Sequence, residues 1–127
     1  MARSIKIAVG GLELRGMLLD TPTAEAIWAA LPIKQRVGVW GGEFYFPSGV
    51  SLAEEAGATE RMEVGALAYW PPGQSFCIFF GPTPASRGSE PRMADPGNVF
   101  GKLTSVPVAE LSKIRSGAEI VIERVEE

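Results

Sequence analysis

Histidine is absent from the 127 residues of this chain, and cysteine occurs once, as Cys77. The absence of histidine removes the commonest general base, the Ser-His and Cys-His catalytic couples and most zinc sites. A single cysteine cannot form a disulfide within the chain. Any catalysis would therefore use carboxylates, arginine, lysine, tyrosine, the thiol or backbone groups. The sequence predicts no metal and no cofactor, and it leaves open whether the protein is an enzyme.

Long apolar runs and an excess of basic charge are also missing. No apolar run approaches the ~20 residues that a membrane-spanning helix needs, and residues 1–7 contain charge but no secretory hydrophobic segment. The net charge is -3, with lysine and arginine scattered along the chain, so nucleic acid is not an expected partner. We expect a soluble cytoplasmic protein that binds neither nucleic acid nor membrane.

Short alternating segments dominate what is present. Gly10-Gly11 and Gly41-Gly42 each separate two segments in which apolar and polar residues alternate. Paired glycines tolerate the positive φ angles of two-residue turns, so each pair predicts a β-hairpin. The predicted strands are residues 5–9, 12–18, 36–40, 43–46, 62–70, 75–80, 99–103 and 119–123.

Two segments have helical features. Thr21 is an N-cap residue ahead of Pro22 at the first helical position, and Pro32 ends this segment. Its apolar stripe, which includes Trp28, is expected to pack on a sheet. The second segment, residues 106–115, is helical or 3₁₀ in character.

Two long loops complete the expected chain. Residues 47–61 are polar, with a brief edge strand possible at Val50 and Leu52, and residues 81–98 show no periodicity and contain four prolines. Loops of that length are usually functional or disordered. Many short strands with one or two short helices favour a single all-β domain over residues 1–127, either a barrel or a sandwich.

The stretch YWPPGQSFCIFFGPTP, residues 69–84, is the densest aromatic segment. Its strand is apolar on both faces, with Phe76 and Ile78 on one face and Cys77 and Phe79 on the other. A barrel interior takes only one face, so a helix, loop, partner or ligand must cover the other. The pattern does not say which face points inward. A groove covered by residues 81–98 is one interpretation, and cover by the helix of Trp28 or by another loop is the alternative.

Candidate ligand-binding residues follow from this groove. Glu43 shares a strand face with Tyr45, so a carboxylate and a phenol could converge there, although a cross-strand ion pair would also explain Glu43. Arg87 and Arg92 could clamp an anionic group or simply be solvated. The candidates are Glu43, Tyr45, Tyr69, Trp70, Phe76, Phe79, Thr83, Arg87 and Arg92. No catalytic residue is assigned, and Cys77 is best explained as a small buried hydrophobe.

Four segments together carry a family resemblance: DTPTAEAIW at 20–28, VWGGEFYF at 39–46, VGALAYWPPG at 64–73 and FCIFFGPTP at 76–84. They resemble a family of small prokaryotic cyclophilin-like proteins whose activity is not established, over residues 5–123. The resemblance implies a mainly β fold, a closed eight-stranded barrel with a helix near each end. True cyclophilins are peptidyl-prolyl isomerases, but this chain lacks their histidine and their arginine-bearing strand followed by Gln-Gly.

Three functions stay open from the sequence. The first is binding of a small molecule or peptide in the aromatic groove. The second is a structural or homo-oligomeric role, in which a second copy covers the same aromatic side chains. Peptidyl-prolyl isomerase-like activity is disfavoured, because no matching catalytic motif is present.

Overall fold

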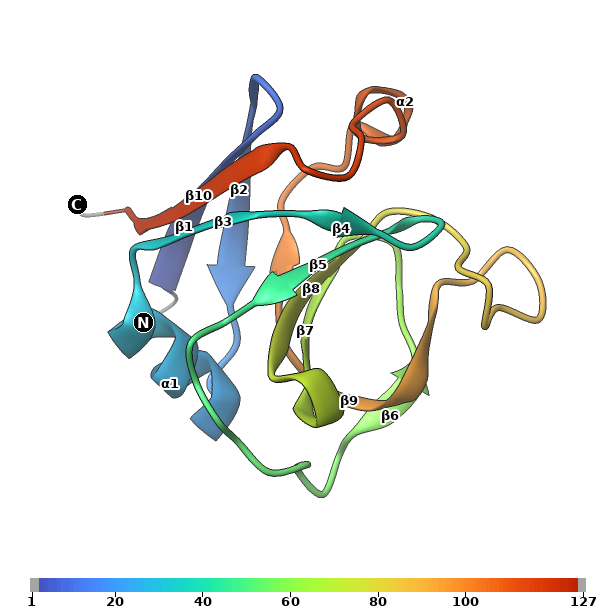
Figure 1. Ribbon diagram of the computed structural model, residues 1–127. Coiled ribbons are helices and arrows are strands. Elements are labelled where there is room, and N and C mark those ends of the chain that lie inside the picture. Colours follow the sequence, from blue (N-terminus) through green and yellow to red (C-terminus); the bar gives the residue numbers. More distant parts are fainter. Residues whose placement is uncertain (1–2, 126–127) are drawn as a thin grey trace.

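The computed structural model describes residues 3–125, and this part of the chain is mainly β (Figure 1). Its strands are β1 (Arg3–Val9), β2 (Leu12–Leu18), β3 (Ile33–Arg36), β4 (Gly38–Val39), β5 (Glu43–Pro47), β6 (Thr59–Arg61), β7 (Ala66–Trp70), β8 (Ser75–Phe79), β9 (Arg92–Leu103) and β10 (Glu119–Arg124). Two α-helices, α1 (Pro22–Ala30) and α2 (Val108–Leu111), and one 3₁₀ turn, η1 (Pro71–Gly73), accompany them.

The strands form one antiparallel sheet that curls around an interior (Figure 1). Their order is β3-β10-β1-β2-β9-β7-β8-β5-β4, with β6 paired to β9. The expected closed eight-stranded barrel is wrong in two respects, because ten strands are present in residues 3–125 and the ladder does not close. At the seam, β3 and β4 are linked by Val37, whose N–H donates to Ala118 O (2.9 Å) and whose carbonyl accepts from Gly117 N–H (2.8 Å). The chain therefore crosses the seam covalently instead of pairing across it.

Both predicted glycine hairpins are confirmed. Val9 faces Leu12 across the first turn, where Gly10 and Gly11 have φ angles of +53° and +87°. In the second hairpin, Val39 faces Phe44, and Gly41 has a φ of +60°. Residues 36–40 do not form one strand, because the chain passes from β3 to β4 at the seam.

The expectation of an irregular segment from 81 to 98 is wrong in its second half. Strand β9 begins at Arg92 and runs through Pro96 to Leu103. Proline lacks the N–H that a regular ladder uses. Here Pro96 lies between Arg92 and Gly97, the stretch over which the register of the β6–β9 pairing shifts. A second shift, in the β7–β9 pairing, follows between Val99 and Gly101. A bulged strand is difficult to recognise from alternation, since the period breaks where the bulge occurs.

Two smaller expectations also change. Val50 and Leu52 form no edge strand. Instead, the Tyr69 hydroxyl donates to Val50 O and accepts from Leu52 N–H, each at 3.0 Å, so their loop is fixed to the sheet. Helix α2 is confined to Val108–Leu111, shorter than the expected segment. Helix α1 is confirmed, with the Thr21 hydroxyl accepting from Ala24 N–H at 3.0 Å.

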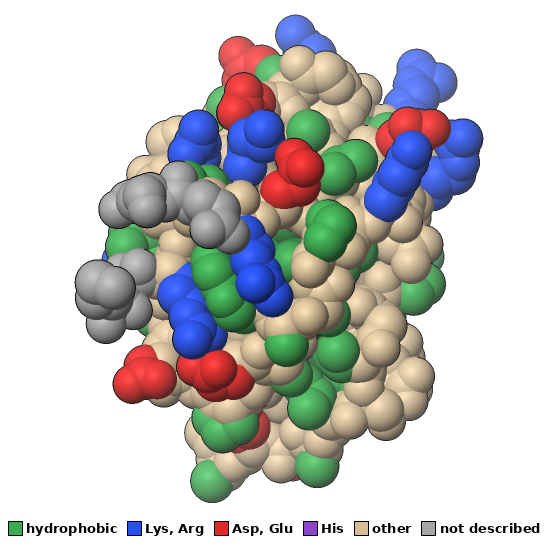
Figure 2. Space-filling model, turned by 90° about the vertical axis from the view of Figure 1, so that its left-hand side faces the viewer, with side chains coloured by type: hydrophobic (Ala, Val, Ile, Leu, Met, Phe, Trp, Pro, Cys, Tyr) green, Lys and Arg blue, Asp and Glu red, His purple; other side chains and the backbone are tan. Residues whose placement is uncertain are grey.

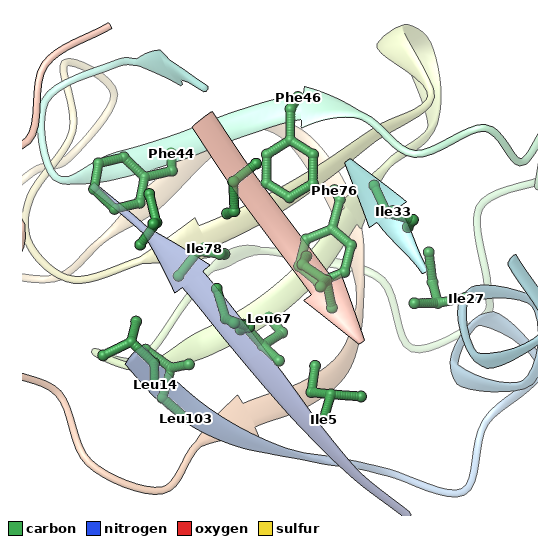
Figure 3. Close-up of a cluster of buried hydrophobic side chains, with 14 of the residues drawn as sticks. Ile5, Leu14, Ile27, Ile33, Phe44, Phe46, Leu67, Phe76, Ile78 and Leu103 are labelled. Atoms are coloured by element: carbon green, nitrogen blue, oxygen red, sulfur yellow. The ribbon is translucent and has the colours of Figure 1, made fainter. Parts of the chain in front are cut away.

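The interior is filled by alternate residues of the curled sheet (Figure 3). Phe44 and Phe46 of β5 and Phe76 and Ile78 of β8 point into it, and each is at most 1% exposed. On the opposite face of β8, Cys77 and Phe79 belong to a second cluster, which we call the outer cluster. It consists of Met62, Ala66, Ala68, Cys77, Phe79 and Met93, with Trp70 and Val99 packed against it. The chain's own β9 therefore covers much of the second face of β8.

Trp28 is only half-buried, although it packs against the main core as expected. The guanidinium groups of Arg3 and Arg124 lie 5.2 and 5.0 Å from its ring centroid. Figure 2 shows a face on which lysine and arginine side chains gather around hydrophobic ones. This indole is thus covered by cations that the chain itself supplies.

Candidate functional site

A pocket of about 280 Å³ lies on the outside of the sheet, at the start of β5 and next to the outer cluster. It is lined by Trp40, Glu43, Tyr45, Trp70, Met93 and Ala94. We call it the outer pocket. Two of the three tryptophans and one of the two tyrosines in the chain line it.

The hairpin between β4 and β5 positions one side of the pocket. Glu43 and Tyr45 face outward because their partners on β8, Phe79 and Cys77, belong to the outer face. The backbone N–H of Trp40 donates to Glu43 O at 2.9 Å. Only glycine fits at position 42 between them, since a Cβ there would lie 2.3 Å from the carbonyl carbon of Gly81.

The end of β7 supplies the other side. The Trp70 indole N–H donates to the Asp95 carboxylate at 3.1 Å. Its benzene ring lies over Gly73, where a Cβ would approach Cζ3 to 2.4 Å. Trp70 is therefore held by β9 and by η1, which leaves it pre-positioned along the pocket wall.

Glu43 dominates the electrostatics of the pocket. Glu43 is 5% exposed, and this burial raises the pKa of its carboxyl from 4.5 to about 7. A hydrogen bond with the Cys77 thiol lowers the pKa and so opposes part of the shift. Within residues 3–125, no lysine or arginine forms a salt bridge with Glu43. The ion-pair explanation of Glu43 is therefore wrong, because its cross-strand neighbour on β8 is Phe79. A carboxyl with such a pKa can accept or release a proton near neutral pH.

Cys77 is the neighbour of Glu43 beneath the pocket. Burial, and then the charge of Glu43 and a hydrogen bond to it, raise the pKa of the Cys77 thiol well above its usual value. A protonated thiol is a poor nucleophile. Cys77 is 1% exposed, and the structure places it as packing material of the outer cluster.

The nine candidate residues divide into three groups. Glu43, Tyr45 and Trp70 line the outer pocket, and Phe79 packs in the cluster beside it. Tyr69 and Phe76 are both 0% exposed and belong to the interior core, away from the pocket.

The remaining three candidates lie in the segment between β8 and β9 or at its end. The Thr83 hydroxyl donates to Arg92 O, and the Glu90 carboxylate accepts from Arg87 N–H at 2.9 Å and from Arg92 Nε at 3.1 Å. These contacts order the segment itself. Neither arginine lines the outer pocket.

Three lining residues were not predicted. Trp40 directly precedes the Gly41-Gly42 turn, and its position beside a conspicuous hairpin was the available signal. Met93 and Ala94 lie on the bulged part of β9, where alternation gives no guide. Met93 and Ala94 reach the outer pocket only because β9 lies over the outer face of β8.

A larger depression, of about 490 Å³, lies next to β6 and includes Arg61, Glu63 and Glu90. Arg61 and Glu63 are exposed, so water already solvates their charges. The outer pocket instead combines aromatic walls with a buried ionisable group, the combination typical of ligand sites. Within residues 3–125, no group of three or more Cys, Asp or Glu residues is arranged to hold a metal ion. None of the helices described is long and apolar enough to cross a membrane.

The fold and its outer pocket can now be set beside known proteins. The chain belongs to the cyclophilin-like family, whose model matches residues 3–123. It is also similar to the hypothetical protein AF2241 from Archaeoglobus fulgidus, whose solution structure superposes with a TM-score of 0.81 at 33% identity, covering 98% of this chain and 95% of that one. No curated protein matches the chain. The resemblance seen in the sequence is therefore confirmed, and no activity comes with it.

Proposed function

We propose that the protein binds a small organic molecule, or a short peptide segment, in the outer pocket. The observation that carries this proposal is Glu43, a carboxyl that is 5% exposed and has no basic partner among the described residues. A buried ionisable group without a counter-ion costs stability, and such groups concentrate at functional sites. Its position among three aromatic side chains supports a ligand-binding role.

The pocket is suited to a modest ligand. Its volume of about 280 Å³ is near the lower end of the ~300–1,000 Å³ that small-molecule sites occupy. The aromatic walls would contribute apolar contact area, and Glu43 would fix the orientation of one polar group. No arginine is among the six lining side chains, so prolyl isomerisation has little support here.

A homo-oligomeric role is the second candidate. Leu19 and Val64 are 44% and 48% exposed, and both line a depression near β9 that also includes Met62 and Val99. A second copy of the chain would remove this apolar surface from water. We also keep a cytoplasmic location as a prediction.

A thermal-shift screen against a library of metabolites and proline-containing peptides tests the binding proposal. It compares the wild type with Tyr45→Ala, which alters the pocket, and with Val108→Ala, which alters α2. Tyr45 and Val108 are each 42% exposed, so both truncations should leave the core intact. A ligand at ten times its Kd stabilises by about 1.4 kcal/mol, which raises Tm by several degrees.

Stabilisation of the wild type and of Val108→Ala, with a clearly smaller shift in Tyr45→Ala, would support the outer pocket. Equal shifts in all three proteins would place binding elsewhere. If no compound stabilises the wild type and size-exclusion chromatography shows a dimer, the homo-oligomeric role becomes the better explanation.

A further inference from the structure

The faces of Trp40 and Trp70 differ from the face of Trp28 in one respect. Trp28 has two guanidinium groups, those of Arg3 and Arg124, within about 5 Å of its ring centroid. Among residues 3–125, no arginine or lysine lies over the other two tryptophans in this way. No arginine or lysine of the described residues therefore competes with an external cation for the pocket tryptophans.

The charged side chain that lines the pocket and the charged side chain that bonds one of its walls are both acidic. Glu43 lies inside it, and Asp95 is held at its side by the Trp70 indole N–H. Arg92, on the same strand as Asp95, is directed to the Glu90 carboxylate at 3.1 Å. An anionic ligand would meet repulsion from Glu43, whereas a cation would supply the counter-charge that this buried carboxyl lacks.

The lining also discriminates between kinds of cation. A primary ammonium has three N–H donors that need acceptors, and only Glu43 and Tyr45 among the six lining side chains carry oxygen. A quaternary ammonium has no N–H donors, and its methyl groups pack directly on aromatic faces. Met93 and Ala94 extend the apolar lining that such methyl groups would contact.

We propose that the ligand of the outer pocket carries a methylated ammonium group, held against Trp40, Tyr45 and Trp70 with Glu43 as its counter-charge. This inference rests on the proposed function, because it names the class of ligand for the same pocket. A methylated ammonium group does not fill the entire pocket, so the remaining space would hold the rest of the ligand.

The test compares choline with its neutral isostere 3,3-dimethylbutan-1-ol, in which carbon replaces the charged nitrogen. Binding is followed by two-dimensional ¹H–¹⁵N NMR, where each of the three indole N–H groups gives one signal. Choline should shift the signals of Trp40 and Trp70 and leave that of Trp28 in place. The isostere should bind at least tenfold more weakly.

Glu43→Gln is the decisive variant, because it removes the charge and keeps the shape. We expect it to weaken choline binding by about tenfold and to leave the isostere nearly unaffected. Glu25→Gln is the matched control, since this carboxylate lies on α1, where it pairs with Arg3. Choline affinity should not change in it, and NMR spectra of both variants report whether they remain folded.

Three results would overturn the inference. These are equal affinity for choline and the isostere, unchanged choline affinity in a folded Glu43→Gln variant, and no shift of the two pocket indoles at about 50 mM choline. The proposed function would survive them if a neutral compound from the thermal-shift screen still depended on Tyr45. It would fail separately if no compound bound at that pocket.

Discussion

Replacing Glu43 by glutamine should stabilise the unliganded protein at neutral and alkaline pH. The folded-state pKa of Glu43 is about 7, against 4.5 for an unperturbed glutamate. Between these two values the native state binds more protons than the unfolded state, so stability falls as pH rises. The effect is absent below about 4.5, increases through the interval and levels off above about 7. Glutamine occupies the same space without carrying a charge.

The magnitude follows from the size of the shift. The difference of roughly 2.5 pKa units, at 1.36 kcal/mol for each unit, is a penalty of about 3 kcal/mol when the carboxyl is ionised. Urea denaturation of both proteins at several values between pH 4 and pH 8.5 measures it. Taking the difference between variant and wild type at each pH cancels the titration of all the other groups. The advantage of Glu43→Gln should grow from near zero to about 3 kcal/mol.

Parallel stability curves would refute this reasoning. They would mean that Glu43 titrates alike in the folded and unfolded chains, as an exposed carboxyl does. A variant that is less stable at every pH would indicate instead that the carboxylate makes a favourable interaction, and the argument for a missing counter-charge would fall with it.

Four further outcomes are expected. Choline affinity, measured by NMR titration, should rise from pH 6 to pH 8 as Glu43 ionises, and this dependence should vanish in Glu43→Gln. The other ionisable side chains around the pocket are Tyr45 on β5, Cys77 on β8 and Asp95 on β9. Tyr69→Phe should lower the free energy of unfolding by about 1–3 kcal/mol in urea denaturation, since its hydroxyl bonds Val50 O and Leu52 N–H; an unchanged midpoint would contradict the role of this bond. Gly38→Ala should weaken choline binding with less than about 1 kcal/mol lost in stability, because the new Cβ would lie 2.4 Å from Cζ of the half-exposed Tyr45 ring and displace it; full affinity by calorimetry would speak against Tyr45. The Glu90 carboxylate accepts a hydrogen bond from Arg87 N–H at 2.9 Å, so Glu90→Gln should speed tryptic cleavage after Arg87. Cleavage at the wild-type rate would show that this contact does not order the segment.

The sequence was most informative where one local rule decided the structure. Gly10, Gly11 and Gly41 adopt the positive φ angles that their turns require, and Thr21 caps a helix, so the two hairpins and α1 could be located from the local sequence alone. Glu43 and Tyr45 were assigned to one face by strand alternation, and the structure places both in the outer pocket.

Errors arose where tertiary contacts decided the outcome. Tyr69 was expected in a groove, but β7 directs it into the interior, where Val50 and Leu52 satisfy its hydroxyl. Alternation separates the two faces of a strand without saying which is inside. The bulged start of β9 also hid Met93, because a proline-containing segment with register shifts has no regular period.

The alternation along β5 also has an evolutionary consequence. Phe44 and Phe46 pack in the interior, whereas Glu43 and Tyr45 line the outer pocket. If the proposed function holds, substitutions at the two outward positions would alter the ligand while the inward side chains, on the opposite face of the strand, keep their packing. Related chains could keep one scaffold and diverge in specificity by exchanging only these outward side chains.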